Sequence, residues 1–367
     1  MFPDNRRIFT FFKGRVALYA LLKSFGIGEG DEVILPGYTC VVVPSAVRFV
    51  GAVPVYGDID PACFNMTPKT AGALVSRRTK AIIVQHTYGL PAEMDGFTNL
   101  AQKHGIVVIE DSAHAWGALY DKRPVGTLGD AAFFSSQWSK PFTTGLGGFC
   151  CVDPRHDAVQ TRLRSIHAGF RLPSFGERAV LEAEYLAYRI TYTPRTYWTL
   201  MGFYRSLYTA GLIPGSSSPA ELDLRKPAGY EKRMSAGVER RLFSLLNNAS
   251  GLIAHRGEIA AVYSSLLPGP AVSPRLDPVF LRYPVRVRDK QAALAAALKS
   301  RIEMGDWFVS PLHPLTKGLE RLGYIHGMCP ESEKACSQTV NLPTHAGISR
   351  DEAFRIARFV IEQGVAA

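Results

Sequence analysis

The sequence predicts an α/β fold, with a large domain built on a mostly parallel sheet flanked by helices and a smaller C-terminal α+β domain. Between about residues 14 and 151, short and nearly continuous apolar runs alternate with helical patterns. Strands that helices cover on both faces have this character, because neither face of the sheet meets water. From about residue 233 onward helices outnumber strands, which favours a second domain. We therefore place the domains at 1–232 and 233–367.

The elements of the first domain follow from apolar runs and from the residues that end them. The stretch 14–36, "GRVALYALLKSFGIGEGDEVILP", reads as a helix, a glycine-rich stop and a strand. A second helix, "DGFTNLAQKHG", occupies 95–105 and also ends at a glycine. The remaining strands are short apolar runs that end in polar residues or turns, at 52–60, 80–89, 106–115, 130–136 and 147–153.

The second domain begins with a long amphipathic pattern. Residues 234–267 place apolar side chains at helical spacing and predict one long helix. The alternating run "VFLRYPVRV" (279–287) predicts a strand, and 290–301 predicts a helix. A final helix is expected over 349–364, where Ser349 is suited to cap the first turn.

The segment between these two parts differs from both. Residues 175–220 read as an aromatic-rich helical insertion, and arginine is the only charged residue type between Tyr185 and Tyr208. One interpretation is an insertion that packs on the main domain or on a second subunit. The other is a lipid-binding surface over 185–208, because tyrosine, tryptophan and arginine suit a membrane interface.

The overall composition limits the classes of partner. The 367 residues are 47% hydrophobic and carry a formal charge of +10, which attracts anions without specifying their kind. No helix-turn-helix pattern or basic cluster accompanies this charge, so no nucleic acid partner is expected. A charge excess that only aids solubility would explain the value as well.

The cysteines and the apolar runs bear on location. None of the six cysteines forms a C-x-x-C pair and their spacing matches no zinc site, so we expect no metal. Buried, reduced thiols in a cytosolic protein explain them. The N-terminal residues lack a secretory pattern, and no apolar run is long enough to span a membrane. The predicted location is the cytoplasm, with peripheral attachment to the inner membrane if the insertion binds lipid.

Polar residues collect where the predicted strands end. Sheets of this class bind ligands at the carboxyl ends of their strands. The loop "GLGGF" (145–149) lets the backbone approach closely, but it lacks the spacing of a dinucleotide-binding or P-loop motif. The sequence therefore predicts one site at this edge, formed by the residues that end or follow the apolar runs, namely Thr39, His86, Asp111, Ser135 and Lys140.

Lys140 and Asp111 point to a particular chemistry. Lys140 lies among apolar and neutral residues in "FSSQWSKPF" (134–142). Desolvation lowers the pKa of a lysine, and only the unprotonated amine attacks a carbonyl carbon. Asp111 ends a buried strand and needs a cationic partner, which the protonated pyridine nitrogen of pyridoxal 5′-phosphate (PLP) would supply. A surface lysine with an apolar stem and a helix-capping aspartate are the alternative roles.

Three further positions fit the same cofactor. His114 could hydrogen-bond the phenolic oxygen of PLP, or it could be a core histidine with protein partners. Ser135 and a helix that begins at Gly14 and Arg15 would hold the phosphate through a hydroxyl and backbone N–H groups. A plain turn at Gly14 is the alternative.

Together these stretches resemble the DegT/DnrJ/EryC1/StrS aminotransferases, which are PLP-dependent sugar aminotransferases of fold type I. The resemblance covers nearly the whole chain apart from about 170–232. The matching stretches include "GIGEGDEVILPGYTCVVVPSAV" (26–47), "HGIVVIEDSAHAWGALYDKRPVGTLGDAAFFS" (104–135), "SKPFTTGLGGF" (139–149), "SPLHP" (310–314) and "VNLPTHAGIS" (340–349).

The resemblance implies a role for each site residue. Lys140 matches the lysine that binds PLP covalently and moves the proton, Asp111 the partner of the pyridine nitrogen, and His114 the contact to the cofactor's oxygen. Arg15 stands where the family has threonine, so a guanidinium would replace a hydroxyl. The other implied cofactor contacts are Gly14, Ser135, His86 near the ring, and Tyr38, which would replace the aromatic expected at Cys40.

The implied function is a PLP-dependent aminotransferase. The expected reaction moves an amino group from an amino acid, with glutamate as the expected donor, to a keto group of a nucleotide-linked sugar. The expected assembly is a homodimer with both sites at the interface. One alternative keeps the chemistry but places a lipid-linked or otherwise bulky keto substrate at the membrane surface. The other is a non-catalytic binding or regulatory protein of the PLP fold, against which the intact set of Lys140, Asp111 and Ser135 argues.

Overall fold

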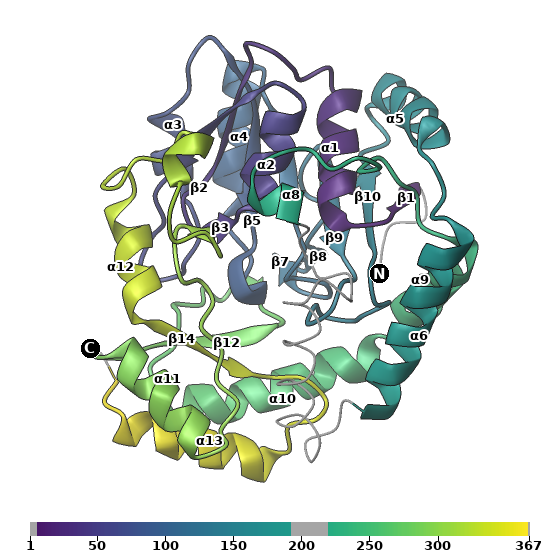
Figure 1. The fold of residues 1–367 in the computed structure, drawn as a ribbon. Coiled ribbons are helices and arrows are strands. Elements are labelled where there is room, and N and C mark those ends of the chain that lie inside the picture. Colours follow the sequence, from purple (N-terminus) through teal and green to yellow (C-terminus); the bar gives the residue numbers. More distant parts are fainter. Residues whose placement is uncertain (1–5, 192–218, 366–367) are drawn as a thin grey trace.

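A seven-stranded sheet forms the centre of the protein, in the order β1-β10-β9-β6-β5-β2-β4 (Figure 1). The computed structural model describes residues 6–191 and 219–365. Five neighbouring strands are parallel, namely β9 (Ala131–Ser135), β6 (Val107–Asp111), β5 (Thr79–Gln85), β2 (Glu32–Pro36) and β4 (Val53–Gly57). The predicted mostly parallel sheet is therefore confirmed. Two antiparallel strands complete it. Strand β10 (Gly148–Val152) was predicted at 147–153, whereas β1 (Ile8–Phe11) was not predicted from the sequence.

Helices cover both faces of this sheet. One face packs against α1 (Gly14–Ser24), α2 (Val42–Phe49) and α5 (Asp157–Gly169). The other packs against α3 (Pro68–Gly72), α4 (Met94–His104) and α9 (Ala236–Asn247). Successive side chains of a strand point to opposite faces, so Phe133 joins the first core and Phe134 the second. This double burial explains why the strands read as almost continuous apolar runs.

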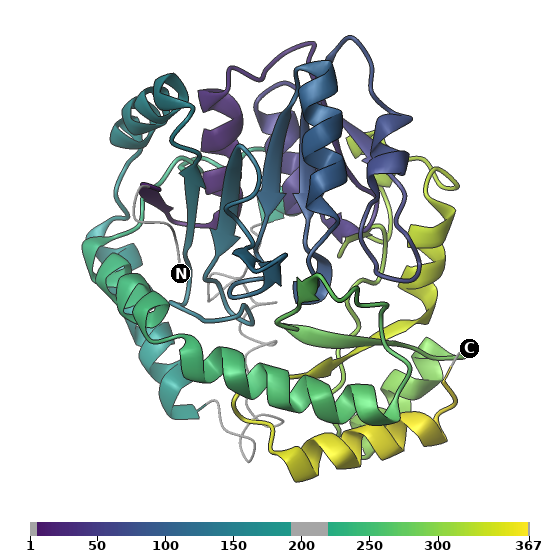
Figure 2. The same ribbon diagram turned by 180° about the vertical axis from the view of Figure 1, so that it is seen from behind.

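The C-terminal part builds a second core. Strands β12 (Arg282–Arg286) and β14 (Thr339–Pro343) pair antiparallel and pack against α10 (Ser250–Leu266), α11 (Lys290–Lys299) and α13 (Arg350–Glu362) (Figure 2). Helix α9 instead buries Val238 and Leu242 against the large sheet. The second core thus begins with α10, whereas the boundary at 232/233 stays a prediction.

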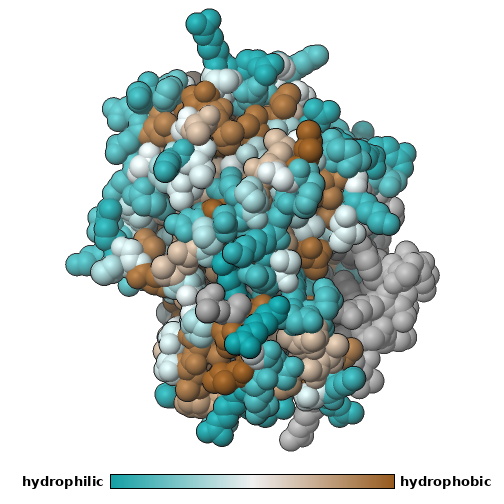
Figure 3. Space-filling view, turned by 90° about the vertical axis from the view of Figure 1, so that its left-hand side faces the viewer, coloured by the Kyte–Doolittle hydropathy of each residue, from teal (hydrophilic) through white to brown (hydrophobic). Residues whose placement is uncertain are grey.

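The side of the molecule that carries α12 (Pro330–Gln338) shows apolar patches among hydrophilic side chains (Figure 3).

The single helix predicted over 234–267 is wrong, because the chain forms α9 and α10 with a break at Asn248. The backbone of Asn248 leaves helical geometry at φ −112° and ψ 20°. Its side-chain amide donates to the Ser244 carbonyl at 2.7 Å. Asparagine side chains compete with the helical backbone in this way, and the pair Asn247–Asn248 supplies the break.

The other elements predicted for the C-terminal part are confirmed, namely the strand within 279–287 and the helices within 290–301 and 349–364. The Ser349 cap is also confirmed, because its hydroxyl accepts from the Glu352 N–H at 3.1 Å.

The insertion begins with α6 (Phe175–Thr191), which lies beside α9 (Figures 1 and 2). The Arg241 guanidinium of α9 stacks 3.7 Å from the ring centroid of Tyr185 and pairs with Glu182. The proposed lipid-binding stretch 185–208 lies outside the described residues from 192 onward, and the chain returns with α8 (Pro219–Leu222). In the portion described, we find no helix with the length and apolar character that a membrane span requires.

Short elements bring distant loops to the sheet edge. Strand β13 (Leu312–His313) pairs in parallel with β3 (Thr39–Cys40), directly after the carboxyl end of β2. This pairing carries the loop before it, residues 307–311, over the carboxyl ends of the central strands. The other short elements are β7 (Leu119–Tyr120), β8 (Arg123–Pro124), β11 (Leu276–Asp277), and the 3₁₀ turns η1 (Thr87–Gly89) and η2 (Leu319–Leu322).

Candidate active site

The predicted site residues meet at the carboxyl edge of the central sheet. Asp111 is the last residue of β6 and Ser135 the last of β9, and these two strands are neighbours. Lys140 follows in the loop between β9 and β10. The order of the strands therefore brings residues from separate segments to one place, as expected for an open parallel sheet.

The amine of Lys140 lies in a setting that favours its neutral form. Burial lowers the lysine pKa; the charges of Cys40 and Asp111 oppose this effect, and that of Arg15 adds to it. The side chain is partly exposed to a pocket, and Nζ lies 5.5 Å from the ring centroid of Trp307. A lysine held in this way is closer to the state in which it can attack a carbonyl carbon.

Asp111 is a buried carboxylate that lacks a full counter-charge. Burial raises its pKa to about 6, although the backbone N–H of Ala113 and the charges of Lys140 and His86 act in the opposite direction. Its Oδ1 accepts from the Ala113 N–H at 3.0 Å. A cation placed against this carboxylate would restore its ionised form, and a protonated pyridine nitrogen is such a cation.

His114 has an unused ring nitrogen. The imidazole is buried, and its Nδ1 has no hydrogen-bond partner among the residues that the structure describes. Its ring stacks on Trp307 with centroids 5.7 Å apart. Burial, together with the charges of Lys140, His313 and Arg282, holds its pKa well below the usual value. A neutral buried imidazole with a vacant nitrogen is suited to a hydrogen bond with a ligand oxygen.

Gly14 and Ser135, the residues predicted to contact the phosphate, lie against each other. A Cβ on Gly14 would come within 2.9 Å of the Phe134 carbonyl oxygen and 3.2 Å of the Ser135 Cβ, so only glycine allows this approach. Gly14 is also the first residue of α1, an 11-residue helix. The helix N-terminus thus lies against the serine, in an arrangement that favours a phosphate group.

Arg15 is bound by a carboxylate that sequence reasoning missed. Its Nη1 lies 2.6 Å from Oε1 of Glu221, and Lys13 Nζ lies 3.4 Å from the other oxygen of the same carboxylate. Arg15 and Glu221 are both buried. Burial and the Arg15 charge lower the pKa of Lys13 to about 8, against the influence of Glu221. Glu221 follows 206 residues after Arg15, and no local pattern connects the two positions.

Tyr38 and His86 have protein partners. The Tyr38 hydroxyl lies 2.7 Å from that of Tyr88, and its ring packs edge-on against Phe308. His86 Nε2 lies 3.1 Å from Oε2 of Glu110, and its Nδ1 accepts from a backbone N–H. These contacts make both residues supports of the site in this structure, and their contact with a cofactor stays a prediction.

Trp307, in the loop before β13, and His313, in β13 itself, also lie at the site. Trp307 contacts both Lys140 and His114. Burial lowers the pKa of His313 to about 4, and the nearby charge of Lys140 contributes to this shift. The motif "SPLHP" marked this region in the sequence, but Trp307 precedes it and carried no signal of its own.

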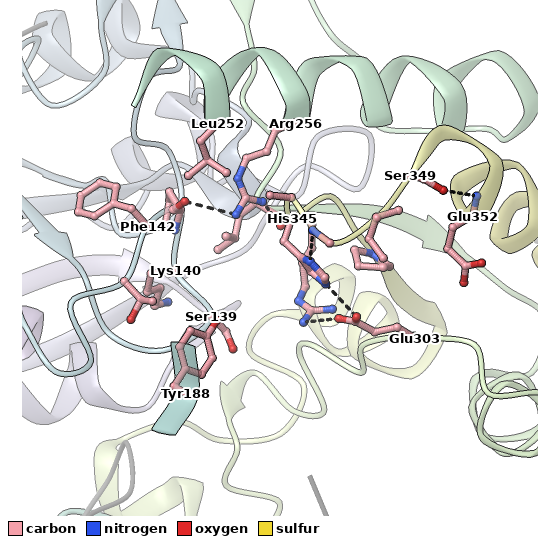
Figure 4. Close-up of a pocket in the computed structure, with 18 of the residues that line it drawn as sticks. Ser139, Lys140, Phe142, Tyr188, Leu252, Arg256, Glu303, His345, Ser349 and Glu352 are labelled. Carbon is pink, nitrogen blue, oxygen red and sulfur yellow. Dashed lines mark hydrogen bonds and ion pairs between the residues drawn. The ribbon is translucent and has the colours of Figure 1, made fainter. Parts of the chain in front are cut away.

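A pocket of about 780 Å³ opens beside Lys140 (Figure 4). Lys140 and Tyr188 lie on one side of it, Glu303 and His345 on the other, and Arg256 reaches in from α10. Among the residues that the structure describes, its lining has six cationic side chains and two carboxylates. The cations are Lys140, Arg189, Arg256, Arg282, Arg301 and Arg355, and the carboxylates are Glu303 and Glu352.

The two carboxylates neutralise only part of this charge. Arg282 and His345 lie 3.3 Å and 2.9 Å from Glu303, and Arg355 lies 2.6 Å from Glu352. Within the described chain no carboxylate pairs with Arg189, Arg256 or Arg301, the other arginines of the lining. The pocket therefore has a surplus of positive charge, which favours an anionic ligand.

Arg256 also connects the lysine loop to the second domain. Its guanidinium donates to the Leu281 carbonyl at 2.9 Å, to Thr344 Oγ1 at 2.7 Å and to the Pro141 carbonyl at 3.4 Å. Pro141 directly follows Lys140. Burial and the neighbouring Arg282 charge lower the pKa of Arg256 to about 10.

The residues present fit PLP. Asp111 offers a carboxylate for the ring nitrogen, His114 an unpartnered nitrogen for the phenolic oxygen, and Lys140 an amine for the aldehyde carbon. Gly14 and Ser135 offer a cradle for the phosphate. The contacts with the cofactor are inferences from these groups, because the His114 nitrogen has no partner among the described residues and the Asp111 carboxylate lacks a full counter-charge.

Comparisons with known proteins agree with this arrangement. The sequence model of the DegT/DnrJ/EryC1/StrS aminotransferase family matches residues 4–189 and 203–360, so it omits part of the insertion. The structure of DesV from S. venezuelae shares 26% identity at a TM-score of 0.69, covering 97% of this chain and 84% of that chain. The fold is therefore that of PLP-dependent aminotransferases, as predicted.

Two curated relatives illustrate the range of similarity. L-glutamine:scyllo-inosose aminotransferase of Streptomyces griseus is 44% identical over 147 residues, which are 40% of this chain and 35% of that protein. A protein named "Pleiotropic regulatory protein" from Geobacillus stearothermophilus is 30% identical over 95% of this chain and 82% of its own length. The alignment to the first relative thus spans about a third of that protein. On the family model and the long second alignment, the chain belongs to the DegT/DnrJ/EryC1/StrS aminotransferase family, whose members use PLP.

Proposed function

We propose that this protein is a PLP-dependent aminotransferase that aminates a keto group on a sugar carrying a diphosphate, as in a nucleotide-linked sugar. The observation that carries the proposal is the convergence of three groups at one edge of the sheet. These are the amine of Lys140, the carboxylate of Asp111 and the unpartnered nitrogen of His114. Family membership supports the same reaction class.

Some residues of the site would hold the cofactor, and Lys140 would transfer the proton. PLP, when bound, supplies an electron sink for the carbon that loses its proton. Asp111 keeps the ring nitrogen protonated, which maintains that capacity. Lys140 takes a proton from the substrate carbon and returns it as general base and acid. His114, whose ring stacks on Trp307, would hydrogen-bond the phenolic oxygen of the cofactor.

The charge of the pocket supports a diphosphate on the acceptor. A neutral cyclitol ketone, of the kind named for the Streptomyces griseus relative, would leave the arginines of the pocket without an anion. A diphosphate would pair with guanidinium groups, which bind its oxygens by charge-assisted hydrogen bonds. Thermal unfolding with a nucleoside diphosphate and with the matching nucleoside tests this step. We expect the diphosphate alone to raise the melting temperature, and equal effects would contradict the assignment.

The reaction itself is tested by absorption spectroscopy with PLP. We expect the wild-type protein to show a visible band of bound cofactor that decreases when the amino donor is added. The donor named for the Streptomyces griseus relative is glutamine, so glutamine and glutamate are tried separately. The Lys140→Ala variant should not form the band. A wild-type protein without the band would overturn the enzyme assignment and favour a binding or regulatory role.

The proposed assembly is a homodimer, in keeping with the family. Light scattering during gel filtration measures the mass in solution, and a monomer at all concentrations would contradict it. A lipid-linked keto sugar is the second candidate acceptor, because it carries the same diphosphate. Helix α6 lines the pocket and also carries exposed apolar side chains, among them Phe175 and Leu186, which favours this candidate.

A further inference from the structure

Helix α6 has an outer face of exposed apolar side chains. Five of the fourteen large apolar side chains that are exposed in the described residues lie between 172 and 190. Their exposed fractions are 80% for Phe175, 76% for Ile190, 57% for Leu186, 55% for Leu172 and 45% for Val180. Soluble surfaces normally scatter such side chains, so this concentration indicates an interaction surface.

The apolar residues form one continuous face. At about 3.6 residues per turn, Phe175, Leu186 and Ile190 lie within about 60° of one another around the helix axis. Ala179 lies between these positions and Ala183 about 20° beyond Ile190, and both are also exposed. The result is an apolar stripe along the 17 residues of α6. An amphipathic helix of this kind lies flat in the boundary between lipid headgroups and acyl chains.

The acidic residues of α6 are paired or buried, although the side chains of Glu177 and Glu182 keep 41% of their surface exposed. Glu177 pairs with Lys232, and Glu182 pairs with Arg241. Both oxygens of Glu184 are buried, and burial raises its pKa to about 7, so its charge at neutral pH is reduced. Two exposed arginines lie beside the stripe: Arg178, whose guanidinium lies 5.9 Å from the Phe175 ring centroid, and Arg171, shortly before the helix begins.

This distribution of charge distinguishes between possible partners. A second copy of the chain would bring like-charged arginines together at this face, on proteins whose formal charge is +10 each. A bilayer that contains anionic lipid offers opposite charge at the arginines and apolar chains at the stripe. We propose that the outer face of α6 docks on a membrane surface containing anionic lipid. The proposal goes beyond the proposed function and does not depend on the identity of the substrate.

The position of α6 gives the docking a consequence. Its inner side contributes Tyr185, Tyr188 and Arg189 to the lining of the pocket that holds Lys140 (Figure 4). A helix that lies on the bilayer would therefore place one wall of the pocket next to the headgroups. Enzyme and membrane-held substrate would then meet in the same layer.

Flotation of the full-length protein with vesicles tests the proposal. One set of vesicles is phosphatidylcholine alone and the other is equal parts phosphatidylcholine and phosphatidylglycerol. We expect flotation with the anionic vesicles only. Replacement of three stripe residues, in Phe175→Ser/Leu186→Ser/Ile190→Ser, should lower the bound fraction at least about tenfold, because each loses apolar burial in the bilayer. Arg171→Gln/Arg178→Gln should weaken binding by removing charge alone.

A matched triple variant controls for the loss of exposed apolar side chains as such. Leu298→Ser/Ile325→Ser/Met328→Ser changes residues of similar exposure, at 65%, 66% and 48%, away from α6. It should float like the wild type. Thermal unfolding checks that both variants are folded, and Phe175→Ser alone carries the test if the stripe variant is not. Three results would overturn the proposal: no flotation of the wild type, equal flotation of the stripe variant, or loss of a dimer in the stripe variant without any lipid binding.

Discussion

Two parts of the candidate site differ in how far their charges are balanced. The cofactor edge is formed by Asp111, His114 and Ser135, which are buried, and by Lys140, which is partly exposed to the pocket. The charges of this edge either have an opposing charge nearby or shift toward neutrality. The pocket mouth, which includes Arg189, Arg301 and Arg355, has more cations than carboxylates. A buried charge without a partner costs several kcal/mol, whereas a charge near solvent is hydrated until a ligand arrives.

The difference separates two functions within one active site. The cofactor edge is complementary to one group of fixed shape, because strand ends and backbone hydrogen bonds hold its residues. Glu110, for example, accepts from the N–H groups of Gly126, Leu128 and Gly129 immediately before Asp111. The pocket mouth depends on side chains from loops and from two domains. We therefore expect substitutions at the edge to affect the chemical step, and those at the mouth to affect mainly substrate binding.

Asp111→Asn should have the largest effect. Loss of the carboxylate removes the group that keeps the ring nitrogen protonated, and we expect turnover to fall by about 100-fold to 1,000-fold. The carboxylate pKa of about 6 without ligand lies above its usual value of 3.8. A cationic ring nitrogen would lower it, so binding releases a proton near pH 6. Affinity for pyridoxamine phosphate should therefore rise as pH increases toward about 6 and then level off.

Titration calorimetry at several pH values measures this dependence. Pyridoxamine phosphate has no aldehyde, so covalent attachment to Lys140 does not contribute to the result. The Asp111→Asn variant should lack the rise, because an amide does not titrate. An identical rise in both proteins would show that another group is responsible, and the pairing of Asp111 with the ring nitrogen would then be wrong.

Glu221→Gln should have the next largest effect, on stability. The substitution leaves Arg15 and Lys13 close together without their shared carboxylate. Breaking a buried pair in this way costs about 3 kcal/mol. Chemical unfolding measures the loss, and inorganic phosphate should recover more stability in the variant than in the wild type. Asp223→Asn, at an exposed ion pair nearby, is the matched control and should cost less than about 1 kcal/mol.

An unchanged free energy of unfolding in Glu221→Gln would contradict the contrast between the phosphate end of the cofactor edge and the pocket mouth. It would mean that the charges at the phosphate end are as well hydrated as those of the pocket mouth. The distinction between an edge whose charges are balanced or neutral and a mouth with surplus cations would then be wrong for the phosphate end.

The sequence predicted the cofactor edge better than the pocket mouth. Strand ends in a parallel sheet have a fixed relation to the binding edge, so Asp111, Ser135 and Lys140 could be placed from local patterns alone. The partner of Arg15 could not, because Glu221 is brought to it only by the path of the whole chain. The arginines of the pocket mouth likewise come from separated segments, and their separate patterns give no sign that they share one surface.

The break between α9 and α10 and the exposed stripe of α6 show a second limit. Apolar spacing predicts that a helix has an apolar face, but it does not say whether that face is covered. The spacing over 234–267 fits one helix as well as two, and the side chain of Asn248 decides between them. On α6, burial falls on the side with Leu181 and Tyr185, and the side with Phe175 is exposed.

Arg301→Gln tests the mouth directly. If a phosphate of the acceptor contacts this guanidinium, its loss should raise the KM for the acceptor about tenfold while kcat changes little, because the contact is the same in the ground state and the transition state. Steady-state kinetics with varied acceptor measures both constants. Arg77→Gln, at an exposed arginine outside the pocket lining, should match the wild type. A fall in kcat with unchanged KM would place Arg301 in the chemical step and contradict the division.

Ser349→Ala should have the smallest effect and tests whether the mouth needs to be rigid. The hydroxyl of Ser349 caps α13 and lines the pocket. Loss of the cap should cost about 1 kcal/mol of stability, measured by chemical unfolding. Ser337→Ala, whose hydroxyl bonds a carbonyl at the exposed end of α12, should cost less. If the mouth binds through flexible, hydrated cations, kcat/KM should change less than about twofold. A large loss of kcat/KM with the expected small loss of stability would mean that α13 must hold the mouth in one geometry, as the strands hold the cofactor edge.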